Sequence, residues 1–243
     1  MTDPATPMNE ADAQDSTGGL AAFVRDATRR SIAEGLAAPR ERVSLEALLG
    51  DSAELAVRLT DALRGESTLH ERIACQAGCG WCCHVHVVVS AAEALRVTRF
   101  LRETRSPESL ERVREKLACL DDRTRGLGRE ARADTRLPCA LLEDFSCSVH
   151  PVRPLRCRSW SSLDVERCKV EYERPRSGNL EIENVQWEVT RAVAAGVAEG
   201  IGAAGLDGER LELTAAIRVA LETPDAEARW LAGEPIFAGA EAR

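Results

Sequence analysis

The sequence predicts a mainly α fold, in which a helical domain surrounds an irregular centre rich in cysteine. Three observations support this fold class. Ala, Leu, Arg and Glu are abundant, whereas aromatic residues make up only 4% of the 243 residues, and such a composition favours helices. Apolar residues recur at helical spacing towards both ends of the chain. Neither strand–helix alternation nor an internal repeat is visible.

The first two helices are expected at residues 20–37 and 44–65, because apolar positions follow the helical period in both segments. Pro39 lies between them and ends the first helix or bends the connection. At residues 69–83 the period disappears, and glycines between the cysteines allow the backbone to turn tightly. The valines at 85–89 then predict a short extended segment.

Two helix starts follow in the middle of the chain. Ser90 and Glu93 form the pattern of a capping box, which opens a helix over residues 91–104. Ser106-Pro107 is the second start, because serine is a good N-cap and proline fits the first helical turn. Both signals lie within a few residues of the helices that they begin, so they predict these starts from local sequence alone.

Residues 137–160 lack periodicity and contain three prolines, so an irregular segment is expected there. Helical patterns return at residues 184–204, 208–222 and 224–232. These elements divide the chain into four parts: a disordered tail at 1–19, N-terminal helices at 20–72, a cysteine-cluster metal-binding domain at 73–175 and C-terminal helices at 176–243.

Composition and charge limit the compartment and the partners. The net charge of −8 does not support a nucleic-acid partner, and the arginine-rich stretches at 123–136 and 153–158 are expected to be solvated faces. Residues 1–19 have no apolar run and are therefore not a secretory signal. No stretch reaches the ~20 apolar residues of a membrane helix, so no membrane partner is expected. A cytoplasmic location follows, where thiols stay reduced.

Eight of the nine cysteines fall into two groups. The first group has the spacing C-x3-C-x2-C-C and the second is more widely spaced; the members are Cys75, Cys79, Cys82 and Cys83, and then Cys139, Cys147, Cys157 and Cys168. Thiolates are soft, strongly donating ligands that can enclose a Zn²⁺ ion or an iron–sulfur cluster. Because disulfides are not expected in the cytoplasm, metal binding is the simplest use of these residues.

Several arrangements of these eight thiols remain open. Two four-thiolate zinc sites would use all of them, whereas one cubane 4Fe-4S cluster would use four and leave the others for a second metal or for redox chemistry. Both groups could instead close one shared site, and a zinc site could simply stabilise the fold. Cys82 and Cys83 are adjacent and point in different directions in most backbones, so one of them could serve a second metal. Cys119 follows a helical pattern and is expected to be a small core residue.

Three histidines lie close to the cysteines. His84 and His86 follow the double cysteine, and His150 lies three residues after Cys147. Each could complete a mixed sulfur–nitrogen site, or could be a hydrogen-bonding neighbour of the ligands.

Arginines flank the second group. Arg153, Arg156 and Arg158 bracket Cys157 in the sequence. Four thiolates on Zn²⁺ leave a net negative charge, which guanidinium groups nearby would offset while lowering the pKa of the thiols. Arg156 alone could equally be a solvated surface residue.

The cysteines, the Arg153-Pro154 pair and the Cys157-Arg158 pair recur in an order that resembles a known family. Over about residues 75–170 the chain is similar to the CxxCxxCC, or YkgJ-type, cysteine-cluster proteins, whose domain is described as zinc- or iron-chelating. This resemblance implies metal binding at Cys75, Cys79, Cys82, Cys83, Cys139, Cys147 and Cys157, and also at Cys168. The chain departs from the family pattern in its first spacing, which is x3 instead of x2, and in His150, where tyrosine is frequent.

Two enzyme classes share parts of this pattern. The domain resembles the cysteine-rich part of flagellin lysine N-methylases, which implies an iron–sulfur-dependent, protein-modifying enzyme as the alternative function. The segment from Cys75 to Cys82 also fits C-x3-C-x-aromatic-C, the pattern of radical SAM enzymes. Those enzymes place the pattern after the first strand of a β/α barrel, whereas here a helical segment precedes it. The sequence therefore predicts a protein that chelates zinc or iron through both cysteine groups, and it identifies neither catalytic residues nor a protein partner.

Overall fold

The computed structural model describes residues 10–39, 43–65, 71–175, 177–178 and 180–242, and this part of the chain contains ten α-helices, two 3-10 helices and four short strands. The α-helices are α1 (Glu10–Leu36), α2 (Leu45–Arg64), α3 (Ala91–Thr104), α4 (Pro107–Thr124), α5 (Arg129–Asp134), α6 (Leu155–Arg158), α7 (Val165–Glu173), α8 (Asn184–Ala203), α9 (Leu213–Glu222) and α10 (Ala226–Leu231). The other elements are η3 (Trp81–His84), η4 (His150–Val152), β1 (Val88–Val89), β2 (Leu142–Glu143), β3 (Ser146–Cys147) and β4 (Leu211–Glu212). The predicted mainly α class is confirmed.

Local sequence signals account for the starts of the central helices. The Ser90 hydroxyl accepts a hydrogen bond from the Glu93 backbone N–H at 3.3 Å, and the Glu93 carboxylate accepts one from the Ser90 N–H at 2.9 Å. This is the predicted capping box of α3. Ser106 caps α4 in the same way, with Pro107 as the first residue of that helix.

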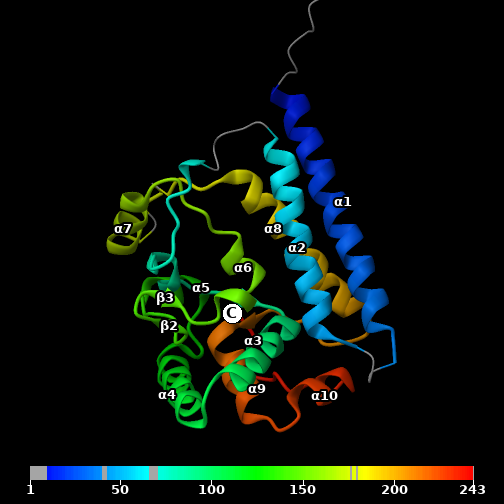
Figure 1. Ribbon diagram of the computed structural model, residues 1–243, viewed down its shortest axis with the longest axis vertical. Helices are drawn as coiled ribbons and strands as arrows, with labels where there is room; N and C mark the ends of the chain where they lie inside the picture. The colour runs from blue at the N-terminus through cyan, green and yellow to red at the C-terminus, as the bar shows by residue number, and fades with distance from the viewer. Residues whose placement is uncertain (1–9, 40–42, 66–70, 176, 179, 243) are drawn as a thin grey trace, which may run out of the picture.

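Helix α1 packs along α8, and α2 contacts both of them (Figure 1). Two glycines of α8 make the close approach possible. A Cβ atom at Gly196 would lie 2.4 Å from the Arg25 carbonyl oxygen, and one at Gly200 would lie 2.7 Å from the Arg29 carbonyl oxygen. The helices expected at the two ends of the chain therefore form one bundle.

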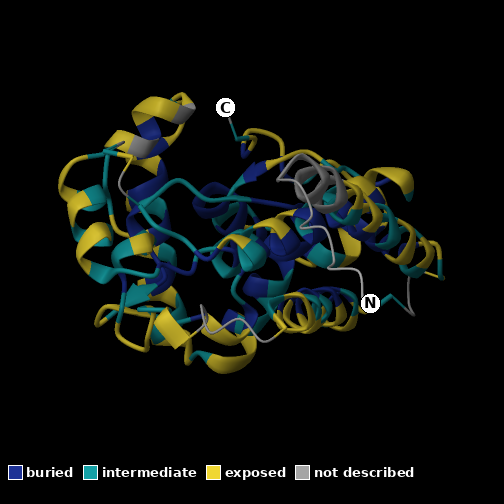
Figure 2. Ribbon diagram, turned by 90° about the horizontal axis from the view of Figure 1, so that it is seen from above, coloured by how far each residue is buried: buried dark blue, intermediate teal, exposed yellow. Residues whose placement is uncertain are grey.

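A second layer is built by α3 and α4, which pack on α9. These helices and α10 contribute buried apolar side chains to the core, among them Leu101, Leu117, Ile217 and Trp230. Figure 2 shows the buried residues concentrated between the helices. Strand β1 pairs antiparallel with β4, with Val88 opposite Glu212. The valine run is thus extended as predicted.

The structure differs from the predicted boundaries in two places. Helix α1 begins at Glu10, so residues 10–19 are helical and do not belong to the predicted tail, whose first nine residues lie outside the described part. Good helix formers in this segment, such as Glu10 and Gln14, favour the extension. The helix predicted from residue 208 begins at Leu213, because β4 precedes it and the Glu212 carboxylate caps it by accepting from the Ala215 N–H.

Within the described residues, none of the helices combines the length and the apolar composition needed to cross a bilayer.

Candidate metal centre

One cavity of about 570 Å³ brings the two cysteine groups together. Seven of the eight predicted ligands line it: Cys75, Cys79, Cys82, Cys83, Cys139, Cys147 and Cys157. All nine cysteines of the chain are free thiols. Cys168 does not line the cavity and lies on α7, which packs against η3.

The first cysteine group lies on a tight turn that leads into η3. Gly78 has φ 83°, a backbone conformation that favours glycine, and the Cys79 N–H donates to the Gln76 carbonyl at 3.1 Å. Gly80 is buried against the hairpin formed by β2 and β3, where a Cβ atom would lie 3.0 Å from Leu142 Cδ1. The absence of a side chain at Gly80 allows the hairpin to approach the turn.

Backbone hydrogen bonds join the second group to the first. The Cys139 N–H donates to the Cys83 carbonyl at 2.7 Å, across the 55 residues that separate these two cysteines in the sequence. Cys147 lies on β3 opposite Leu142 of β2, and the Leu142 N–H donates to the Cys139 carbonyl at 3.0 Å. Cys83, Cys139 and Cys147 are therefore held together by main-chain contacts.

Cys157 is carried by the short helix α6, whose start is fixed by α3. The Leu155 N–H donates to the buried Glu93 carboxylate at 2.8 Å. Arg158 stabilises the preceding turn, because its side chain donates to the carbonyls of Arg153 and Pro151.

Ser162 connects Cys75 with Cys168. Its backbone N–H donates to the Cys75 sulfur at 3.3 Å, and its side chain also hydrogen-bonds to the Cys168 thiol. Cys168 lies within electrostatic range of Cys75, Cys79 and Cys82. The eighth predicted ligand is therefore a neighbour of the first group, although it lies outside the cavity wall.

The pKa values of the adjacent thiols Cys82 and Cys83 are shifted in opposite directions. A hydrogen bond from the Cys83 thiol lowers the pKa of Cys82 from 9.0 to about 7, and the same hydrogen bond raises the pKa of Cys83. Burial raises the pKa of Cys139 to about 11 and that of Cys157 well above its ordinary value.

The three arginines near Cys157 have different positions. Arg153 lines the cavity and lies within electrostatic range of four cysteines: Cys75, Cys82, Cys147 and Cys157. Its Nε is buried without a hydrogen-bond partner. Arg156 is instead directed to tryptophans, with its guanidinium 4.5 Å from the ring centre of Trp187 and 5.3 Å from that of Trp160. Of the three, Arg153 is best placed to offset negative charge on the thiols.

Two of the three histidines, His84 and His150, lie at the cysteine turn and in the cavity wall. His84 is buried, and its Nδ1 lies 3.2 Å from the Gly80 carbonyl oxygen, a distance that suits a hydrogen bond to the backbone of the cysteine turn. His150 begins η4 and lines the cavity. Burial and the nearby Arg153 and Arg158 lower the pKa of His150, which favours its neutral form.

In the described part of the chain, no three His, Cys, Asp or Glu side chains are placed closely enough to hold a metal ion as they stand. Cys119 is exposed on α4 and is not the core residue that the sequence predicts. Its helical neighbours Leu117 and Leu120 occupy the buried face instead.

A family model for the CxxCxxCC domain, described as "Putative zinc- or iron-chelating domain", matches the part of the chain that carries all of these elements. Residues 74–187 are therefore similar to the CxxCxxCC domain. The resemblance predicted from the cysteine pattern is confirmed, and the match extends beyond residue 170 to Trp187. Comparison with curated proteins and with solved structures gave no significant match.

The structure places two residues in the wall of the thiol cavity that sequence reasoning missed, Arg132 and Glu212. Arg132 of α5 is only 4% exposed, although its arginine-rich stretch was expected to be solvated. It lines the thiol cavity together with Glu212, and their side chains form an ion pair at 3.5 Å. The Nε of Arg132 is buried without a hydrogen-bond partner. No local signal identifies this arginine, because Glu212 is 80 positions away in the chain.

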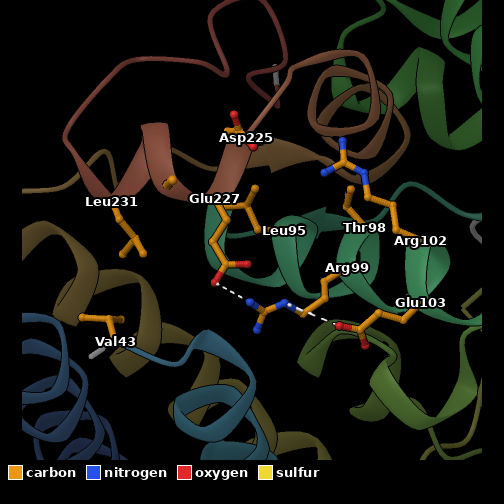
Figure 3. A pocket seen from close by; sticks show the side chains of 11 residues that line it. Val43, Leu95, Thr98, Arg99, Arg102, Glu103, Asp225, Glu227 and Leu231 are labelled. Atoms are coloured by element: carbon orange, nitrogen blue, oxygen red, sulfur yellow. Dashed lines mark ion pairs between the residues drawn. The ribbon is translucent and has the colours of Figure 1, made fainter. Parts of the chain in front are cut away.

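A second cavity, of about 660 Å³, lies between α3 and α10 (Figure 3). Arg99 forms ion pairs within the wall, 3.4 Å from Glu227 and 3.9 Å from Glu103. Arg102 donates to the Ala220 carbonyl at the end of α9. No cysteine lines this cavity.

Proposed function

We propose that this protein chelates zinc or iron through thiolates that face the cavity of about 570 Å³. The observation that carries the proposal is the convergence of two cysteine groups, separated by 55 residues, on one cavity. The proposed ligands are the eight cysteines of both groups: Cys75, Cys79, Cys82, Cys83, Cys139, Cys147, Cys157 and Cys168. The matched family description supports the same class of metals.

The donor set fits a thiophilic metal. Sulfur ligands favour Zn²⁺ and iron–sulfur clusters over Mg²⁺ or Ca²⁺, which prefer oxygen. Arg153 contributes a positive charge beside four of the thiols and a buried N–H that lacks an acceptor. A bound metal–thiolate group would supply the negative sulfur atoms that this N–H lacks.

The chain's own residues would hold and shield the metal. Backbone hydrogen bonds fix the cysteine turn and the β2–β3 hairpin, while the buried side chains of Leu141 and Val149 form part of the apolar cavity wall. Thiols must lose their protons on binding, so metal affinity will increase with pH. The metal, when bound, would crosslink segments that are distant in the sequence and stabilise their irregular backbone.

Metal analysis of serine variants tests the proposal. Cys82→Ser and Cys157→Ser are each expected to lower the bound metal measured by mass spectrometry of purified, anaerobically prepared protein. Cys119→Ser is the matched control, because Cys119 is an exposed thiol away from the cavity. Equal metal content in all three variants would contradict the assignment.

The same sample distinguishes zinc from iron. A colourless protein that contains zinc supports a chelating or fold-stabilising centre. A brown protein whose visible absorption is bleached by dithionite supports an iron–sulfur cluster, including the 4Fe-4S form. The nine free thiols agree with a reducing compartment, and we infer the cytoplasm as the setting for this chemistry.

One observation favours a second candidate function, that of an iron–sulfur-dependent enzyme similar to flagellin lysine N-methylases. Seven of the thiols line a cavity of about 570 Å³, so a cluster held by four of them would have space for a small molecule beside it. Such an enzyme would increase the mass of a lysine-containing protein by a methyl group when a methyl donor is present. An unchanged substrate mass with iron-loaded protein would leave chelation as the function.

A further inference from the structure

Hydrogen bonds and side-chain neighbours arrange the eight thiols in two sets of four that meet at the pair Cys82-Cys83, and each set has the size of a complete tetrahedral site. We propose that the domain holds two metal centres. The inner set consists of Cys83, Cys139, Cys147 and Cys157, and the outer set consists of Cys75, Cys79, Cys82 and Cys168. This inference rests on the proposed function, because it concerns how the same thiols share their metals.

Main-chain contacts and mutual neighbours define the inner set. Cys139 donates its N–H to the Cys83 carbonyl, and the β2–β3 hairpin holds Cys147 next to Cys139. Cys157 lies within electrostatic range of Cys139 and Cys147, as Cys83 also does. All four side chains are half-buried and line the cavity. They come from three separate segments, so a metal here would join η3, the hairpin and α6.

The outer set is defined by Ser162 and by α7. Ser162 hydrogen-bonds to both Cys75 and Cys168, which lie 93 positions apart. Cys168 and Cys75 each lie within electrostatic range of Cys79 and Cys82. Helix α7, which carries Cys168, packs against η3, which carries Cys82.

The two sets meet at the adjacent pair Cys82-Cys83. Their side chains hydrogen-bond to each other, and Cys83 has Cys139 and Cys147 as further neighbours. Cys82 has neighbours in both sets: Cys75 and Cys168 in the outer set, and Cys147 and Cys157 in the inner set. Two centres explain why both cysteines are present in succession. A single four-thiolate centre would leave four of the eight thiols without a metal.

The two centres differ in their access to solvent. Two members of the outer set, Cys75 and Cys82, are exposed, whereas no member of the inner set is. Chelators in solution will therefore reach the outer metal first. The outer centre is the exchangeable one, and the inner centre stabilises the fold.

Zinc titration of the reduced, metal-free full chain tests the partition. Wild-type protein and the Cys119→Ser control are expected to bind two Zn²⁺ ions per chain, each with four thiolates. Cys168→Ser is expected to bind one, and the remaining ion should resist a chelator that removes half of the zinc from the wild-type protein rapidly. Cys157→Ser should lose the slowly removed ion.

The outcomes separate this inference from the proposed function. A wild-type chain that binds one Zn²⁺ ion would overturn the two-centre arrangement and leave chelation intact, whereas a chain that binds neither Zn²⁺ nor iron would overturn both. Two ions in Cys168→Ser would also overturn the partition. Should Cys157→Ser not fold, Cys168→Ser still decides the question, because Cys168 is half-buried on a short helix outside the cavity wall. Circular dichroism of each variant confirms that it is folded.

Discussion

The two cavities of this protein are similar in size but opposite in chemistry. The cavity between α3 and α10 has a volume of about 660 Å³; Arg99 forms ion pairs within its wall, and Arg102 donates to the Ala220 carbonyl at the end of α9. The thiol cavity has a volume of about 570 Å³, and Arg132 and Arg153 each retain a buried Nε without a hydrogen-bond partner. Volume therefore does not distinguish a site from a gap between helices. The thiol cavity is distinguished by its buried donors without partners and by its sulfur ligands.

The largest difference between the cavities should follow metal removal. Stripping the metal from the loaded protein with a chelator should destabilise the thiol lobe strongly, because structural zinc contributes about 10–16 kcal/mol of apparent binding energy in small zinc domains. Hydrogen exchange should increase in residues 137–160 and stay constant at Leu95 and Leu231 of the other cavity. Equal exchange in both regions would mean that the metal does not stabilise the thiol lobe.

A matched pair of arginine variants comes next. Arg153→Gln should weaken metal binding by about 10- to 100-fold, the range typical of residues that support metal ligands without binding the metal. Arg99→Gln removes a guanidinium from the other cavity and should leave metal affinity unchanged. Competition with a chromophoric zinc chelator measures both affinities. Similar losses in the two variants would point to a general effect of charge.

The reactivity of Cys82 gives a pH dependence. In reduced, metal-free protein its pKa of about 7 makes half of it thiolate at that pH, so alkylation by iodoacetamide should be half-maximal near pH 7 and should fall at lower pH. Because nucleophilicity falls with pKa, the gain at pH 7 over an ordinary thiol should be about sixfold. Peptide mass mapping against pH measures it.

Cys83→Ala is the control for this assignment. It removes the thiol that donates to Cys82, so the Cys82 thiolate loses stabilisation and the midpoint should shift towards 9. A midpoint that stays near pH 7 would assign the low pKa to another cause, such as Arg153.

The smallest expected effect concerns the turn beneath the hairpin. Gly80→Ala would place a Cβ atom 3.0 Å from Leu142 and 3.1 Å from the Phe145 carbonyl oxygen, and such overpacking costs about 1 kcal/mol or more. Gly202→Ala is the control, because nothing lies within 4 Å of its Cβ and alanine favours the helix. Urea unfolding should therefore give changes of opposite sign, and a stabilising Gly80→Ala would contradict the packing described here.

Helix starts could be predicted because their determinants lie within a few residues of each other. The Ser90–Glu93 capping box and the Ser106 N-cap are contacts between residues three positions apart, and both are present as predicted. The N-terminus of α9 was misplaced because β4 depends on pairing with β1, more than 120 positions earlier in the chain. Local patterns carry no information about such a partner.

In the candidate metal centre, too, local patterns could be predicted from the sequence, whereas contacts between distant residues could not. Spacing identified the two cysteine groups, but only the fold brings Cys139 to Cys83 and aligns Arg153 with the thiols while directing Arg156 to the tryptophans. Cys119 illustrates the opposite error, since its helical pattern did not reveal which face of α4 is buried. The direction of a side chain depends on what packs against its element.

Glu93 shows how a residue outside the wall of the thiol cavity can influence variant effects. One carboxylate oxygen caps α3, and the other accepts the N–H that starts the helix carrying Cys157. Substitutions at Glu93 would therefore loosen a predicted ligand without touching the cavity. In a mutational scan of this protein, substitutions at Glu93 should lower metal binding as substitutions of the cysteines do, although Glu93 itself acts as a helix cap.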